Sequence, residues 1–194
     1  MKLWLVRHAR PLLASGICYG RLDVAADAAG TAQCAQALAA QLPPGTRVFS
    51  SPLQRCEQLA SALYGLRPDL AYKTEPRLQE MDFGQWEGRT WQGIDPAELA
   101  AWTDDFAGHA VGRSGECVRG FMARVGAVFD GLQSPSDTLW ITHAGVIRAV
   151  DLLARGVRCP QQASQWPLDA PNYGQWRTLA LPTGHANQAQ TNST

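Results

Sequence analysis

The sequence is poor in charge of either sign. Charged residues make up 18% of its 194 residues, against about a quarter in an average protein. The 17 Lys and Arg residues offset 17 Asp and Glu residues, so the formal net charge is zero. This balance excludes the global positive field that binds nucleic acid or an anionic membrane surface.

Lysine is scarcer still, because only Lys2 and Lys73 occur and the other cations are all arginine. The forked guanidinium of arginine suits phosphate and carboxylate groups. The base composition of a GC-rich genome accounts for the same excess equally well. The placement of the arginines therefore matters more than their number.

The cysteines do not form a recognisable framework. Their number is odd and no Cys-x-x-Cys pair occurs, which argues against a disulfide scaffold or a zinc site. We expect reduced thiols, with Cys34 and Cys56 buried on helices, and neither a metal nor a cofactor. The five residues are Cys18, Cys34, Cys56, Cys117 and Cys159.

Long apolar runs are also missing. No stretch approaches the eighteen or so residues of a membrane span, and the apolar start at Leu3–Val6 is too short for a signal-peptide core. We therefore expect a cytoplasmic protein without a membrane partner. Apolar residues nevertheless make up 45% of the chain, enough for the core of a single domain over residues 1–182. Residues 183–194 lack apolar periodicity and are expected to form a disordered tail.

Short apolar segments alternate with amphipathic ones. This alternation predicts an α/β three-layer sandwich with a mostly parallel central sheet. The irregular segment at about 75–115 is interpreted as a small lid or insertion. Ser51 is expected to cap a helix that has Pro52 at its first position. The predicted strands lie at 3–6, 47–50, 70–72, 137–142 and 175–181, and the other helices at 28–41, 96–106, 118–132 and 145–153.

Polar side chains follow three of the predicted strands. Arg7 and His8 end the first strand, Arg55 lies in the first turn after the second, and His143 ends the fourth. We expect them to converge, because ligands of such sheets bind outside the carboxyl ends of the strands. Two arginines buried near two histidines require a compensating anion, and a phosphoryl group offers several acceptor oxygens. Taken singly, each has a structural alternative, such as a solvated cation or ion-pair partner at Arg55.

These residues predict a phosphoryl-transfer chemistry. A neutral imidazole can attack phosphorus while arginines spread the negative charge, so no metal is required. The leaving oxygen needs an acid, and Glu80 and Asp82 lie on one side of an extended segment. The alternative is that both carboxylates simply cap backbone N–H groups or pair with nearby Arg77 and Arg89. The residues alone leave the choice of acid open.

Four segments resemble the signature blocks of the histidine phosphatase superfamily, the phosphoglycerate mutase-like group, in the family's order. The resemblance implies that His8 forms a phosphohistidine, that Arg7 and Arg55 bind the phosphoryl oxygens, and that His143 completes the pocket. It also favours Glu80 over Asp82 as the proton donor and later base. Cys117 departs from the family, where Ser is more usual. The blocks are Leu5-Val6-Arg7-His8 and the segments 50–56, 78–88 and 142–148.

One departure points to a branch. Many members continue Arg-His with Gly, whereas this chain has Ala9-Arg10-Pro11. This start, together with 18–23 and Tyr173-Gly174, is similar to the alpha-ribazole phosphatase branch. The resemblance implies a metal-independent phosphomonoesterase that removes phosphate from alpha-ribazole 5′-phosphate in cobalamin synthesis.

The loop after the first strand is the predicted substrate-binding element. Its glycine allows a close backbone approach, although a plain turn is the alternative reading. A flat benzimidazole nucleoside would need an aromatic wall, for which Trp86, Trp91 and Trp102 are candidates. For any single one of them, packing of the insertion against the sheet is the favoured explanation. The predicted substrate-binding residues are Arg10, Tyr19, Gly20, Arg21 and Ala144.

The predicted partner is a small phosphorylated metabolite, with inorganic phosphate as product. Alternatives are a phosphatase for a sugar phosphate, phosphoserine or a nucleotide, a phosphoglycerate mutase, and a catalytically dead binding module. An intact set of five motif residues argues against the last. A homodimer is left open by the sequence.

Overall fold

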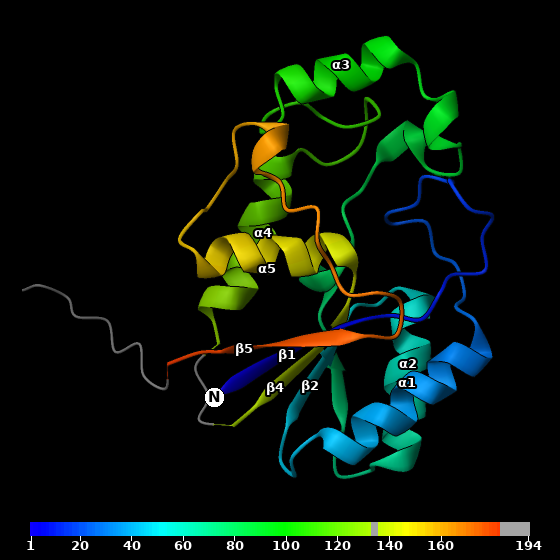
Figure 1. The fold of residues 1–194 in the computed structure, drawn as a ribbon, viewed down its shortest axis with the longest axis vertical. Helices are drawn as coiled ribbons and strands as arrows, with labels where there is room; N and C mark the ends of the chain where they lie inside the picture. Colours follow the sequence, from blue (N-terminus) through cyan, green and yellow to red (C-terminus); the bar gives the residue numbers. More distant parts are fainter. Residues whose placement is uncertain (133–135, 183–194) are drawn as a thin grey trace, which may run out of the picture.

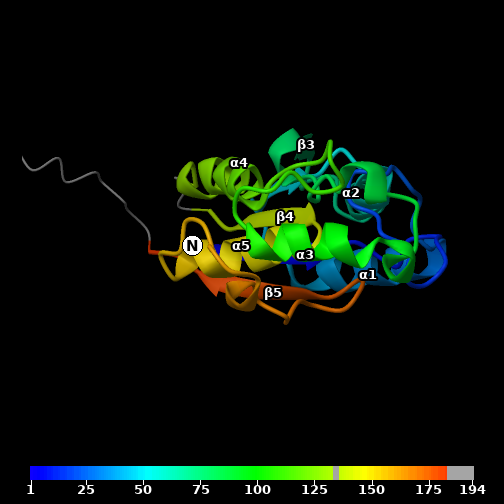
Figure 2. The same cartoon turned by 90° about the horizontal axis from the view of Figure 1, so that it is seen from above.

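The computed structural model describes residues 1–132 and 136–182, so the predicted disordered tail lies outside the described residues. Five strands form one sheet in the order β3-β2-β4-β1-β5. Neighbouring strands are parallel except β5, which runs antiparallel to β1. Figure 2 shows β3 and β5 at opposite edges. The strands are β1 (Lys2–Arg7), β2 (Arg47–Ser50), β3 (Tyr72–Thr74), β4 (Thr138–Thr142) and β5 (Trp176–Ala180).

Helices cover both faces of this sheet (Figure 1). Leu3, Leu5 and Trp140 belong to the core cluster under α4 (Val118–Asp130) and α5 (Ala144–Ala154). The alternate strand residues, among them Trp4 and Val6, belong to the cluster under α1 (Ala28–Gln41) and α2 (Gln54–Leu66). Burial on both faces explains the continuous apolar run of the first strand. The predicted mostly parallel three-layer α/β sandwich is confirmed.

The irregular segment at 75–115 is attached to this core. It contains α3 (Pro96–Asp104), which lies away from the sheet at the top of Figure 1. Trp86, Ile94, Phe106 and Val111 join the same buried cluster as Leu5 on the sheet. Three short 3₁₀ turns lie in this segment and a fourth follows α5. They span Pro76–Leu78, Gly84–Trp86, Trp91–Gly93 and Ala163–Gln165.

The helices predicted at 96–106 and 118–132 end two residues earlier, at Asp104 and Asp130, and two predicted element starts are also wrong. Ser51 does not cap a helix: α2 begins at Gln54, and the Ser51 Oγ contacts His143. The third strand lies at Tyr72–Thr74, because buried Leu70 closes a turn by donating its N–H to the carbonyl of Arg67. At Ser51 a tertiary contact outweighs the local preference for a cap, whereas at Leu70 a local turn delays the start of the strand.

Cys34 and Cys56 are buried on α1 and α2, as predicted. Burial raises the pKa of the Cys34 thiol to about 12. Within residues 1–132 and 136–182, no group of His, Cys, Asp and Glu side chains is arranged to hold a metal ion. In the same ranges, no helix is both long and apolar enough to cross a membrane.

Candidate active site

His8 follows β1 directly and is almost completely buried. Its backbone N–H donates to the carbonyl of Thr142 on β4, over 3.1 Å. The Nδ1 atom lies 2.7 Å from the carbonyl oxygen of Ala9. That oxygen can only accept, so Nδ1 carries the proton and Nε2 holds the lone pair. Burial, followed by the charges of Arg55 and Arg7, lowers the pKa of His8 well below its usual value, which leaves a neutral imidazole.

Arg55 lies in the first turn of α2 and is fully buried. Its Nε donates to Nε2 of His8 over 3.2 Å. Its two terminal nitrogens donate to the carbonyls of Gly20 and Leu22, over 2.6 and 2.9 Å. No carboxylate of the described residues forms a salt bridge with Arg55. The alternative of a solvated cation or ion-pair partner is therefore wrong.

His143 follows β4 and is also fully buried. Its ring centroid lies 5.1 Å from that of His8, and the two rings meet at 61°. Burial, followed by the positive charge of Arg55, lowers the pKa of His143 well below its usual value. Its Nε2 shares a 2.8 Å hydrogen bond with the Oγ of Ser51. Ser51 is a site residue that sequence reasoning missed, although its position directly after β2 was a usable signal.

Tyr173 closes one side of this cluster. The guanidinium carbon of Arg7 lies 3.8 Å from the centroid of the Tyr173 ring. The Tyr173 hydroxyl is 2.7 Å from the hydroxyl of Tyr19, whose ring lies 5.3 Å from the guanidinium of Arg55. Tyr173 was noted only as a family likeness, and its contact with Arg7 joins residues more than 160 positions apart.

Glu80 meets the N-terminus of α5. Its Oε2 accepts a hydrogen bond from the N–H of Gly145 over 3.0 Å, and a Cβ at Gly145 would overlap the Glu80 carboxylate. Arg124 on α4 donates to the carbonyls of Gln79 and Glu80, over 2.8 and 3.0 Å. Arg124 is itself held by Glu116. The Glu80 side chain is thus held by the N-terminus of α5, and its backbone by Arg124. These contacts keep Glu80 close to His143, the residue before α5.

Asp82 is used differently. It pairs with Arg21 over 3.5 Å, on the exposed side of the segment. The expected pairing of Glu80 and Asp82 with Arg77 and Arg89 is wrong, because those arginines bond to Glu75 and Glu98. The capping alternative is confirmed, because the two carboxylates accept the N–H groups of Gly145 and Gly84. Cys117 caps α4 by accepting from the N–H of Gly120, which explains how it replaces the usual serine.

The model of the histidine phosphatase superfamily (branch 1) matches residues 3–178. The chain belongs to the histidine phosphatase superfamily. No curated protein sequence matches it significantly.

Solved structures agree with this membership. TTHB049 from Thermus thermophilus is 30% identical, with 94% of this chain and 95% of that chain covered at a TM-score of 0.72. Two further structures share the fold. The mycobacterial glucosyl-3-phosphoglycerate phosphatase Rv2419c is 24% identical, with 78% of each chain covered and a TM-score of 0.66. Mycobacterial hydrolase 1 is 23% identical, with 91% of this chain and 87% of that chain covered, and a TM-score of 0.75.

The loop after β1 supplies the rim of this histidine phosphatase site. Gly20 is needed because a Cβ there would overlap the carbonyl oxygen of Met81. The backbone at Gly20 therefore comes close to the backbone at Met81, in the neighbouring segment. The Arg21 side chain is 53% exposed and turned to Asp82. Ala144 is buried next to His143. Roles of these residues in substrate binding stay predictions.

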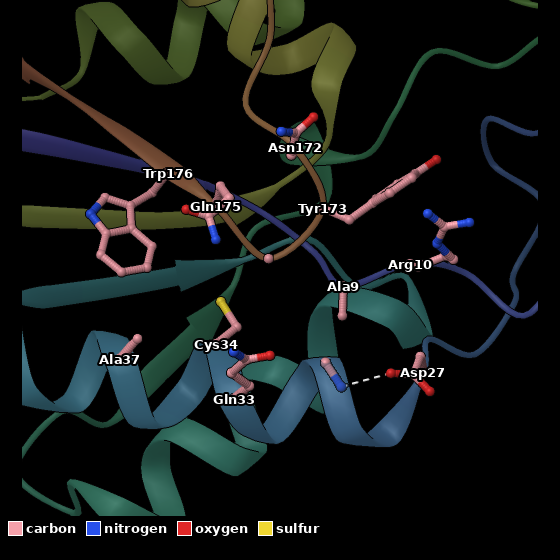
Figure 3. A pocket seen from close by; sticks show the side chains of 12 residues that line it. Ala9, Arg10, Asp27, Gln33, Cys34, Ala37, Asn172, Tyr173, Gln175 and Trp176 are labelled. Carbon is pink, nitrogen blue, oxygen red and sulfur yellow. Dashed lines mark hydrogen bonds between the residues drawn. The ribbon is translucent and has the colours of Figure 1, made fainter.

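Arg10 lies outside the buried cluster. It lines a separate cavity of about 450 Å³ between α1 and the segment 172–176. Figure 3 shows Arg10 and Tyr173 at one end of this cavity and Trp176 at the other. The Arg10 guanidinium carbon is 5.9 Å from the Tyr173 ring centroid. Direct contact of Arg10 with substrate stays a prediction.

The three candidate wall tryptophans have different positions. Trp86 is buried and donates its Nε1–H to Glu98 over 2.7 Å. Trp91 packs edge-on against Phe83, with 5.4 Å between ring centroids. Trp102 lines a second cavity, of about 260 Å³, which Glu80 also lines. Of the three tryptophans, Trp102 is thus the candidate for the aromatic wall, because it lines the same cavity as the Glu80 carboxylate.

Proposed function

We propose that this protein is a metal-independent phosphomonoesterase that acts through a phosphohistidine at His8. The observation that carries the proposal is the buried, neutral His8 beside Arg55, a buried cation with no carboxylate partner in the described residues. Such a cluster requires an anion. Membership of the superfamily indicates phosphatase or mutase activity.

In the first step, the lone pair on His8 Nε2 attacks phosphorus and the bond from phosphorus to the ester oxygen breaks. The Nε2 lone pair faces the Arg55 Nε–H, and a phosphoryl oxygen takes over this donor as it enters. Arg7 and Arg55 then stabilise the charge on the equatorial oxygens. Glu80 gives its proton to the leaving oxygen.

In the second step, water attacks the phosphohistidine. The Glu80 carboxylate takes a proton from this water, the phosphorus–nitrogen bond breaks, and inorganic phosphate leaves. His143 contacts the transferring group, held in orientation by its hydrogen bond with Ser51. His8 and Glu80 return to their starting protonation states, so the cycle consumes one water for each ester.

Within this activity, alpha-ribazole 5′-phosphate is the proposed substrate, in cobalamin synthesis. The proposal rests on the branch resemblance of two segments, around Tyr19 and Tyr173. Their hydroxyls share a hydrogen bond of 2.7 Å beside His8, which supports treating them as one substrate-facing element. Other small phosphate esters are the alternative class.

The mechanism is tested with p-nitrophenyl phosphate in EDTA. We expect His8→Ala to lower kcat/KM by about 10⁴-fold or more, while the control His109→Ala, in the segment between α3 and α4, keeps wild-type activity. Brief exposure to ³²P-labelled substrate should label wild type with an acid-labile, alkali-stable phosphate. An active His8→Ala variant, or a strict need for added metal, would overturn the mechanism.

The substrate is tested by comparing kcat/KM for alpha-ribazole 5′-phosphate, 3-phosphoglycerate and phosphoserine. A preference for the first by about 10²-fold or more supports the branch assignment. A flat profile contradicts it. Transfer of the phosphoryl group back to an alcohol, rather than to water, would indicate a mutase.

A further inference from the structure

The main chain of the loop after β1 lies between Arg55 and a second charged residue, Glu87. Arg55 donates from its two terminal nitrogens to the carbonyls of Gly20 and Leu22, over 2.6 and 2.9 Å. The Glu87 carboxylate accepts the N–H groups of Arg21, over 2.8 Å, and of Leu22. The loop backbone therefore connects the buried arginine of the phosphate site with a carboxylate that has no part in the chemistry described so far.

One amide group makes this connection directly. The carbonyl of Gly20 and the N–H of Arg21 belong to the same amide, and a trans amide holds the two on opposite sides. Arg55 therefore binds one side of the amide and Glu87 binds the other. Hydrogen bonds in such a chain polarise and strengthen one another in the protein interior. Glu87 thus reaches the buried Arg55 cation through one amide group rather than through a salt bridge.

The loop is held at both of its ends. Glu87 is tied to its own segment, because its Oε1 also accepts the N–H of Phe83 over 2.9 Å. A Cβ at Gly20 would lie only 2.9 Å from this Oε1, so the contact depends on glycine. At the other end, the Oδ1 of Asp23 accepts the N–H of Gln54 in the first turn of α2, over 2.7 Å. The loop therefore has one position relative to the helix that carries the arginine.

The position of the loop decides the direction of the Arg55 side chain. A guanidinium is a rigid, planar fork of five N–H donors. When two loop carbonyls accept from its terminal nitrogens, the direction of its Nε–H is set as well. That Nε–H points to Nε2 of His8 over 3.2 Å, where the phosphoryl group is expected to enter.

We propose that Glu87 is a positioning residue for phosphoryl transfer, which acts through the loop amide and Arg55 without touching the substrate. The inference rests on the proposed function and adds a residue to its machinery. Loss of Glu87 should weaken the hold on the phosphoryl group whichever alcohol is attached. If the contact served only to shape the loop for the alcohol, its loss would instead change the ranking of esters.

The test uses two alkyl esters, propyl phosphate (the propyl ester) and 2-(benzimidazol-1-yl)ethyl phosphate (the benzimidazole ester). Glu87→Gln keeps the shape of the side chain but places an amide donor against an N–H that the carboxylate now accepts. We expect kcat/KM to fall about tenfold for both esters. Glu57→Gln is the matched control, because Glu57 lies on the same helix as Arg55 but accepts from the side chains of Tyr72 and Thr74. It should keep wild-type activity.

A double-mutant cycle separates positioning from a merely structural role. In the Arg55→Lys background, Glu87→Gln should cost less than about threefold, because the side chain through which Glu87 acts is already gone. The same loss of about tenfold in both backgrounds would overturn the inference, as would losses that differ more than about fivefold between the two esters. If Glu87→Gln does not fold, Glu87→Asp takes its place with the same expectations, because its carboxylate ends one methylene short of the loop.

Calorimetry with inorganic phosphate judges the inference apart from hydrolysis. If wild type hydrolyses no ester, the proposed function fails, and the affinity for phosphate decides the role of Glu87. Removal of a nearby negative charge would by itself tighten phosphate binding, whereas a displaced Arg55 weakens it. We expect Glu87→Gln to weaken phosphate binding about fivefold and Glu57→Gln to leave it unchanged. Unchanged or tighter binding in Glu87→Gln, or no binding by wild type, would overturn the inference.

Discussion

The two ends of the active site are built in different ways. At the phosphate end, His8 follows β1, His143 follows β4 and Arg55 lies in the first turn of α2. Hydrogen bonds hold all three side chains. At the other end, which we call the alcohol end, aromatic rings from α3, α4 and the segment after α5 surround a cavity of about 260 Å³ beside Glu80. The first end is polar and linked by hydrogen bonds, and the second is mostly apolar.

This difference teaches where each property of the enzyme resides. Groups that perform the chemistry lie on regular elements, whose strand ends fix them relative to one another. The residues that line the cavity beside Glu80 lie partly on the irregular segment at 75–115, and we assign substrate selection to this end because loops placed on a rigid scaffold are where specificity varies. We therefore expect substitutions at the phosphate end to affect all esters alike, and substitutions at the alcohol end to discriminate among them.

Arg55→Lys gives the largest expected effect among the retained-charge variants. Lysine cannot reach Gly20, Leu22 and His8 together, so both the loop and the nucleophile lose a donor. We expect kcat/KM to fall by about 10³-fold for every ester, measured with the propyl and benzimidazole esters. Arg158→Lys, at an exposed ion pair, is the control. A loss that differs more than about tenfold between the esters would break the comparison.

Glu80→Gln should act on the leaving oxygen and not on binding. Alkyl esters need a strong proton donor, whereas p-nitrophenolate leaves without one. We expect kcat/KM, which reports formation of the phosphohistidine and not its hydrolysis, to fall about 100-fold for propyl phosphate and only a few-fold for p-nitrophenyl phosphate. Asp82→Asn, which removes the pair with Arg21, should leave this ratio unchanged. Equal losses in Glu80→Gln on both esters would move the acid role elsewhere.

The convergence of Arg7, His8, Arg55 and His143 could be predicted from sequence, because each lies at the end of a strand or in the turn after one. The Ala-rich segment that ends before Pro43 predicts the helix at 28–41 with its observed bounds, and the structure adds that Asp27 caps its start.

The missed residues depend on distant contacts. The bond of Ser51 to His143 and the stacking of Tyr173 on Arg7 join segments 92 and more residues apart. The choice of Trp102 over Trp86 and Trp91 depends on how an irregular segment packs, for which no periodic pattern exists. The sequence therefore predicts the residues of the phosphate end, which lie on regular elements, far better than the residues of the alcohol end.

Acid should destabilise the protein through the phosphate end. Burial lowers the folded-state pKa of His8 and His143, so the unfolded chain binds protons that the folded chain excludes. Their contribution to stability is complete above the unfolded value of about 6.5 and is lost as the pH falls below it.

Each histidine should lower the free energy of unfolding by about 1.4 kcal/mol per pH unit below that value. Urea unfolding at pH 7.0, 6.0 and 5.0 measures this slope. We expect His143→Gln to flatten it and His109→Gln to preserve it. An unchanged slope in His143→Gln would mean that the acid-sensitive groups lie outside the phosphate end.

The smallest expected effect decides to which end the two tyrosines belong. Tyr173→Phe removes the hydroxyl bond to Tyr19 but keeps the ring over Arg7. One neutral hydrogen bond contributes about 1 kcal/mol, so kcat/KM should fall about fivefold. Tyr19→Phe should cost the same, and the double variant no more, because both remove one bond. If the pair belongs to the phosphate end, the loss is equal for the propyl and benzimidazole esters. A loss confined to the benzimidazole ester would place the pair at the alcohol end, and the boundary between the two ends would then run through Arg7.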